Sequence, residues 1–112
     1  RRFEDLEVWK RSSRLCVSVY KELACCKDYG FKDQITRCSL SIPSNIAEGY
    51  ERGTDKDSNG FFITPKVLVV NYELKYIGIE IGYIKKETGL QWKNEVEQLS
   101  KMLSALIKSR SS

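Results

Sequence analysis

The chain has 112 residues, a length typical of one domain, and its composition of 41% hydrophobic and 30% charged residues is that of a folded protein. It contains no histidine, which excludes Ser-His-Asp and Cys-His catalysis as well as histidine metal sites. Nineteen Lys and Arg against 15 Asp and Glu give a net charge of +4, which permits an anionic partner without requiring one.

The four cysteines predict neither a metal site nor a disulfide framework. They are Cys16, Cys25, Cys26 and Cys38, and no two of them form a C-x-x-C pair. We therefore expect free thiols in a reducing cytoplasm and no cofactor. The most apolar stretch, 67–84, carries Glu73, Lys75 and Glu80, which argue against a membrane span. No membrane association and no small-molecule substrate are expected.

A first helix is predicted over residues 3–26, because apolar residues recur there at steps of three and four. The predicted core stripe consists of Leu6, Trp9, Ser13, Cys16, Tyr20 and Leu23. The run K-D-Y-G at 27–30 is a turn signal.

A second helix is predicted to begin near Asp33, a good N-cap residue, and to end at Gly49 and Gly53. Its apolar stripe contains Ile35, Cys38, Ile42, Ile46 and Tyr50. Pro43 interrupts this pattern, and proline inside a helix costs about 3 kcal/mol. Either one helix kinks there, or one helix ends and a second begins with Ser44 or Asn45 as cap. Because the stripe keeps its phase through Pro43, we favour one kinked helix.

The third segment is ambiguous. Thr54 is a candidate N-cap, but residues 61–84 are rich in β-branched and aromatic residues and predict strand on propensity alone. Pro65 also opposes a helix that passes through it. A break is predicted at K-K-E-T-G, 85–89. The last helix is clear, since apolar residues follow heptad spacing at Trp92, Val96, Leu99, Leu103 and Leu106.

Three stretches of the chain carry a family resemblance: F-E-D-L-E-V-W-K at 3–10, S-I-P-S-N-I-A-E-G-Y-E-R-G at 41–53 and I-G-Y-I at 81–84. Together they resemble the four-helix-bundle family encoded in intervening sequences of bacterial 23S ribosomal RNA genes, over most of the chain. The accessory variability protein of diversity-generating retroelements belongs to the same structural group. The resemblance implies an all-α, up-down four-helix bundle that assembles into a homopentamer, with basic surfaces proposed to bind nucleic acid and no catalytic activity.

Within such a bundle, the second of these motifs is expected to have a structural role. Its residues are Pro43, Ser44, Asn45, Glu48, Gly49 and Gly53. The small residues permit close approach of helices, and the glycines supply the turn into the third helix. Direct contact of Asn45 or Glu48 with a ligand is the lesser alternative.

Residues 65–76 depart from the family pattern. They read P-K-V-L-V-V-N-Y-E-L-K-Y, whereas relatives have a helix of small residues with a Glu-Leu pair there. Codons chosen for this stretch, read two bases later, give K-G-S-C-G-E-L-R-T-Q-I, which has the character of the family. We hypothesise that 61–76, or part of it, is out of frame relative to relatives or reflects a gene-sequence error.

The sequence bears on three classes of function. The first is binding of rRNA or DNA without catalysis, through cations that lie off the apolar stripes. These are Lys10, Arg11, Arg14, Arg37, Arg52 and Lys56. Such residues would contact phosphates without reading sequence. The alternative is a solvated helix face, since Glu4, Asp5 and Glu7 lie close to Lys10 and Arg11 in the sequence. The second is a scaffold that docks a protein partner such as a reverse transcriptase. The third, an enzyme, lacks a histidine, a phosphate loop and a cluster of metal ligands. Trp9 and Trp92 are expected in the core rather than as stacking platforms.

Overall fold

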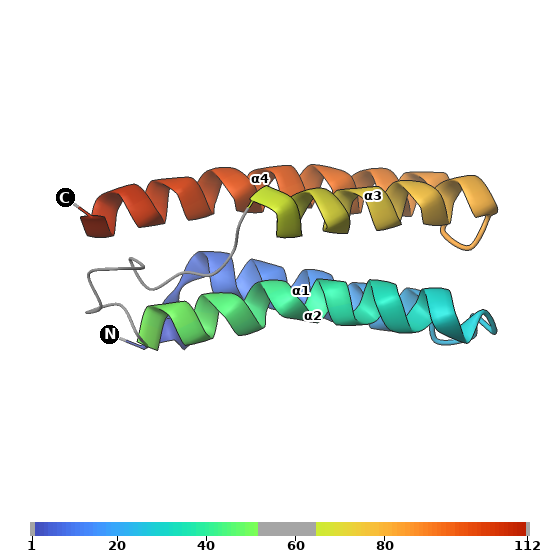
Figure 1. Ribbon diagram of the computed structural model, residues 1–112, viewed down its shortest axis with the longest axis horizontal. Coiled ribbons are helices and arrows are strands. Elements are labelled where there is room, and N and C mark those ends of the chain that lie inside the picture. The colour runs from blue at the N-terminus through green and yellow to red at the C-terminus, as the bar shows by residue number, and fades with distance from the viewer. Residues whose placement is uncertain (1, 52–64, 112) are drawn as a thin grey trace.

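The computed structural model describes residues 2–51 and 65–111, and this part of the chain is all-α. A short 3-10 turn, η1 (Phe3–Asp5), precedes four helices: α1 (Glu7–Glu22), α2 (Tyr29–Glu51), α3 (Pro65–Ile81) and α4 (Lys86–Ser111). Figure 1 shows two helical hairpins, α1–α2 and α3–α4, stacked with their turns at the same end of the molecule. The expected four-helix bundle is confirmed.

The core lies along the whole length of this elongated bundle, which measures 44 × 22 × 20 Å. α1 packs on α2 and α4, and α3 packs on α4 and α2. Five core side chains are wholly buried: Val19, Ile35, Ile42, Ile46 and Leu99. Burial of an aliphatic side chain of this size stabilises the fold by roughly 1.5–3 kcal/mol. Core apolar residues therefore come from the first, second and last helices, whereas α3 contributes differently.

The first helix is shorter than predicted, and its buried side overlaps the predicted stripe only in part, since Leu6, Cys16 and Leu23 of the stripe are buried. It begins at Glu7, after the 3-10 turn, and ends at Glu22. Val8, Leu15 and Val19 are buried, whereas Tyr20 of the predicted stripe is 45% exposed. Because both sets have helical spacing, periodicity did not distinguish the side of α1 that faces the core from the side that borders α2 and η1. Trp9 is partly buried there and meets Phe3 edge-on, with ring centroids 5.3 Å apart.

The start of the second helix was predicted wrongly. α2 begins at Tyr29, because Asp28 rather than Asp33 caps it: the Phe31 backbone N–H donates to Asp28 Oδ1 at 3.1 Å. Asp33 lies inside the helix and pairs with Arg37. Gly49 does not end the helix, since it is buried within it and α2 continues to Glu51. Gly53 and Thr54 lie outside the described residues.

Pro43 lies inside one continuous helix, so the alternative of two helices is wrong. Two side chains bind backbone carbonyls close to the proline. Ser41 Oγ donates to the Cys38 carbonyl at 2.5 Å, and Asn45 Nδ2 donates to the Ser41 carbonyl at 2.7 Å. Asn45 thus bonds back along the helix instead of capping a new one. The kink at Pro43 stays a prediction. The angle between the axes of α2 before and after Pro43 would test it.

The strand propensity of the third segment is overruled, because α3 is a helix. Pro65 occupies its first position, where its missing N–H has no helical partner to lose. The helix ends at Ile81, just before Gly82, whose φ of 95° is the left-handed conformation, and the Tyr83 N–H donates to the Gly78 carbonyl at 3.0 Å. The predicted break at 85–89 is therefore wrong: residues 82–85 form the turn, and the rest belongs to α4.

The heptad prediction for the last helix is confirmed. Trp92, Val96, Leu99 and Leu103 of α4 are buried, and Leu106 is half-buried. At Gly89, a Cβ would collide with the side chain of Ile79 on α3. Glycine at this position therefore permits the close approach of α3 and α4 beside their turn.

Candidate nucleic-acid interface

Exposed cations on α1 form the most regular basic feature of the described residues. Lys10 and Arg14 are exposed, and Lys21 continues the same side of the helix. At 100° and 1.5 Å per residue, these three side chains fall within about 40° of one another and span roughly 16 Å. Within the described part of the chain, none of them forms an ion pair. We name Lys10, Arg14 and Lys21 the α1 cation row.

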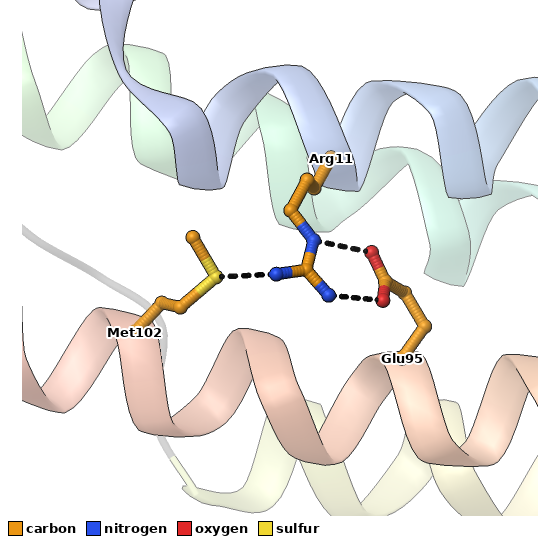
Figure 2. Close-up of polar contacts among 3 residues, drawn as sticks. All are labelled: Arg11, Glu95 and Met102. Carbon is orange, nitrogen blue, oxygen red and sulfur yellow. Dashed lines mark hydrogen bonds and ion pairs between the residues drawn. The ribbon is translucent and has the colours of Figure 1, made fainter.

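Arg11, in contrast, is engaged inside the bundle. Its Nε and Nη2 donate to the two carboxylate oxygens of Glu95 on α4, at 2.9 and 2.5 Å, and its Nη1 approaches the Met102 sulfur at 3.3 Å (Figure 2). This bidentate geometry is the strong form of a charged hydrogen bond. The hydrogen bonds to Glu95, followed by the attraction of its charge, raise the pKa of the Arg11 guanidinium. Arg11 therefore joins α1 to α4 rather than facing a phosphate.

The remaining predicted contacts divide into two groups. Arg37 on α2 lies 3.0 Å from Asp33, with side chains that are 79% and 60% exposed. Such surface pairs contribute roughly 1 kcal/mol or less, so phosphate can compete for Arg37. Arg52 and Lys56 lie outside the described residues. Of the six predicted cations, the structure thus leaves Lys10 and Arg14 without an ion pair in the described region and Arg37 weakly paired.

Sequence reasoning missed two features. Lys21 is not among the predicted cations, although its spacing of seven residues from Arg14 places it on the same side of the helix. Tyr72 and Tyr76 were missed as exposed aromatic residues because their segment was ambiguous between strand and helix, so the side on which they lie was not predicted. Lys93 Nζ lies 4.6 Å from the ring centroid of Tyr72 and 5.5 Å from that of Tyr76, so both rings form cation–π contacts with the same ammonium group.

The motif around Pro43 borders an apolar groove between α1 and α2. The α1–α2 groove has a volume of about 370 Å³, and it is lined chiefly by Trp9, Val17, Leu40, Pro43 and Ala47. Ser44 and Phe3 lie at the same groove. Pro43 and Gly49 are buried in the helix, while Ser44 and Glu48 are exposed. Within the described residues, Pro43 and Ser44 of the motif line one wall of this groove, and the structural role of the whole motif stays a prediction.

Lys75 is a buried amine at the junction of α2 and α3, and its side chain has no exposed surface. Its Nζ lies 3.4 Å from Ser39 Oγ and 3.5 Å from the Asn71 side-chain oxygen. Desolvation lowers the pKa of Lys75 to about 8, while burial raises the pKa of the Cys16 and Cys38 thiols nearby. Thiols with raised pKa values are poor nucleophiles at neutral pH.

The described residues contain no group of three or more His, Cys, Asp or Glu side chains arranged to hold a metal ion. In the same part of the chain, no helix combines the length and apolar character that crossing a bilayer requires.

A family model matches residues 4–105, and its description is 23S rRNA-intervening sequence protein. Neither a curated protein nor a solved structure matches the chain. The matched region covers all of α1, α2 and α3 and most of α4, which agrees with the bundle, the proline-containing second helix and the heptad seam described above. The chain therefore belongs to the 23S rRNA-intervening sequence protein family.

Proposed function

We propose that this protein binds nucleic acid, with ribosomal RNA as the first candidate, and that it catalyses no reaction. The observation that carries this proposal is the α1 cation row, in which Lys10, Arg14 and Lys21 project from one side of a rigid helix. Arg37 adds a fourth accessible cation from α2. Cations of this kind contact phosphates and carry no sequence information, so the binding is electrostatic and falls steeply with salt.

Self-association belongs to the same proposal. Each chain carries a net charge of only +4, and three or four phosphate contacts bind weakly at physiological salt. A homo-oligomer, for which a pentamer is our expectation from the family resemblance, repeats the basic row in every subunit. Repetition raises the overall affinity through effective concentration without any new contact. We place the protein in the cytoplasm, with no membrane and no small-molecule substrate among its partners.

The test is binding to a 23S rRNA fragment that carries the intervening sequence, titrated across salt. Replacement of both Lys10 and Arg14 by Glu is expected to weaken binding at low salt at least tenfold and to flatten the salt dependence. Lys101→Glu is the control, because Lys101 is exposed on α4 and its reversal makes half of that change of charge away from the row, the same as either single row variant. Equal weakening by the control and the row variant would contradict a localised interface.

The alternative function, a scaffold that docks a protein partner such as a reverse transcriptase, is favoured by a different observation. Val17, Leu40, Val69 and Ile81 are large apolar side chains that remain about half exposed. Exposed apolar surface is typical of protein interaction sites. Indifference of the protein to RNA and DNA at low salt, together with co-purification of one stoichiometric protein partner, would favour this alternative over the first.

A further inference from the structure

A polar hollow of about 400 Å³ lies between α1 and α4, next to the α1 cation row. Its walls include Glu7, Arg11, Arg14 and Ser18 of α1 and Gln91 and Glu95 of α4. At 100° per residue, the four α1 positions fall within about 60° of one another, so they share one side of that helix. Arg14 belongs both to the hollow and to the cation row. We name this feature the α1–α4 hollow.

Two contacts between α1 and α4 fix the walls of the hollow. Arg11 and Glu95 form two parallel hydrogen bonds (Figure 2), and Trp92 Nε1 donates to Ser18 Oγ at 3.0 Å. The paired guanidinium and carboxylate are planar groups, and 32% of the Arg11 side chain and 27% of the Glu95 side chain stay exposed. Unpaired RNA bases stack on guanidinium planes. The Arg11–Glu95 pair therefore gives the hollow a flat surface that a base can cover.

Two charges of opposite sign lie on α1 on either side of this pair. Glu7 lies four residues before Arg11, and Arg14 lies three residues after it. Both residues are exposed, and neither forms an ion pair within the parts of the chain that the structure describes. Seven residues of helix separate them by about 10.5 Å, which is comparable to the distance from the pairing edge of a purine to the phosphate of the same nucleotide. The hollow thus offers a cation to a phosphate and a carboxylate to a base.

The carboxylate of Glu7 discriminates among the four RNA bases by its hydrogen-bonding chemistry. An ionised carboxylate only accepts hydrogen bonds, and it accepts two in parallel from adjacent N–H groups. Guanine is the base whose Watson–Crick edge has two adjacent N–H groups, at N1 and N2. Uracil offers one N–H on that edge, and adenine and cytosine each offer one amino group. In a duplex this edge of guanine is already paired, so the ligand has to be an unpaired guanine.

We infer that the α1–α4 hollow binds an unpaired guanine nucleotide of single-stranded RNA. Glu7 accepts hydrogen bonds from N1–H and N2–H of guanine, the base stacks on the Arg11–Glu95 pair, and Arg14 binds the phosphate. This inference rests on the nucleic-acid binding in the proposed function. It adds a base preference and a requirement for an unpaired strand, neither of which the phosphate contacts of the α1 cation row supply.

A purely structural role of Glu7 makes a different prediction. Glu7 is the first residue of α1, and the helix dipole stabilises an acidic residue in the first turn without any ligand. In that role, Glu7→Gln lowers the melting temperature slightly and leaves the relative affinities for different bases unchanged. A comparison of bases therefore separates the two roles.

The test compares short single-stranded RNAs made of uridine with one central guanosine or, in its place, one central inosine, which lacks the 2-amino group. Binding to the full chain is measured by fluorescence anisotropy at low salt. The wild type is expected to bind the guanosine RNA roughly tenfold more tightly than the inosine RNA, because one hydrogen bond to a charged group is lost. Glu7→Gln is expected to bind the two RNAs equally, since its amide has only one acceptor oxygen.

Two control variants separate this inference from the proposed function. Asp5→Asn makes the same change of charge at an exposed residue that does not line the hollow, and it should keep the guanosine–inosine ratio. Lys10→Glu, in the cation row but outside the hollow, should weaken binding of both RNAs by the same factor. Equal binding of the two RNAs by the wild type, or a ratio that survives Glu7→Gln, would overturn the inference, and salt-dependent binding of both would leave the proposed function in place. Absence of all RNA binding at low salt would overturn both.

Discussion

At the scale of single residues, Lys75 is the most unusual group in the described structure. A lysine is seldom fully buried, because its ammonium loses its hydration. The three nearest oxygen acceptors lie 3.4–3.5 Å from Nζ, at the long limit of hydrogen bonding. The resulting fall of the pKa to about 8 means that the charged form weakens the fold at neutral pH.

Stability is therefore expected to rise with pH as Lys75 loses its proton. The unfolded chain keeps the proton up to its ordinary pKa of 10.5, whereas the folded chain releases it near 8, so the unfolded state binds more protons between these values. From pH 7 to 8.5 the free energy of unfolding should increase by roughly 1 kcal/mol. Urea unfolding at the two pH values measures this change.

Lys75→Met supplies the control for this pH dependence. The variant keeps a long flexible side chain without the charge, so it should be more stable than the wild type by about 1–3 kcal/mol at pH 7. It should also lose the increase in stability toward pH 8.5. A less stable Lys75→Met variant would indicate that the bonds to Ser39 and Asn71 outweigh the cost of burying the charge.

At the scale of elements, α3 has a burial pattern opposite to that of the other helices, with polar side chains buried and apolar side chains exposed. Asn71 and Lys75 are buried, whereas Val69 and Tyr76 are at least half exposed. The helix persists because it packs on α2 and α4 along its inner side, which overrides local propensity. Aligned with positions 65–75, the string K-G-S-C-G-E-L-R-T-Q-I places Leu at position 71 and Ile at position 75. The burial pattern thus supports the hypothesis of a shifted reading frame.

Peptide mass mapping of residues 60–86 tests that hypothesis directly on protein expressed from its native gene. Peptides with the masses of the family-like string would establish that the chain differs from the printed sequence at these positions. Peptides with the masses of V-L-V-V-N-Y-E-L-K would show that Lys75 is a genuine buried lysine, and the predictions on its titration would then apply to the natural protein.

The cap of α2 also belongs to the scale of elements. Asp28 receives the Phe31 N–H and the Tyr83 hydroxyl, and these bonds, in that order, lower the pKa of its carboxyl group. Asp28→Ala should lower the melting temperature by a few °C, because it removes both the cap of α2 and the hydrogen bond from Tyr83 in the α3–α4 turn. The stabilisation of the fold by the Asp28 carboxylate is present at neutral pH and disappears as the pH falls through the lowered pKa of Asp28.

Asp33→Ala is the matched variant for the cap, since Asp33 was the residue that the sequence favoured. It removes only an exposed pair with Arg37 and should change the melting temperature less than Asp28→Ala does. Thermal unfolding measures both effects. A larger fall in melting temperature for Asp33→Ala than for Asp28→Ala would indicate that α2 begins at Asp33.

At the scale of the whole molecule, the Arg11–Glu95 pair joins the two hairpins across 84 residues of sequence. Glu95→Gln should destabilise the bundle by roughly 0.5–1 kcal/mol, because the pair is only partly buried. The same change releases Arg11 and removes a nearby negative charge, so affinity for the rRNA fragment should increase several-fold. Glu97→Gln on the exposed side of α4 is the control, and equal increases in both variants would place Arg11 outside the interface.

The sequence by itself determined the features that depend on local periodicity. It predicted the α4 seam, the burial of Ile42 and Ile46, and the passage of α2 through Pro43, because a buried stripe repeats at 3.6 residues whatever surrounds it. The family motifs supplied the four-helix fold. Among the candidate site residues, it identified Lys10 and Arg14 as cations off the apolar stripe.

Only the tertiary structure decided the features that depend on partners distant in sequence. Packing made a helix of the strand-like segment 65–81, and the competition of two apolar stripes selected the core face of α1. Glu95 engages Arg11, while Lys21 joins Arg14 on an open side of α1. Periodicity reports which residues share a side of a helix. Which side meets the core, and which charge meets another, follows from the arrangement of all four helices.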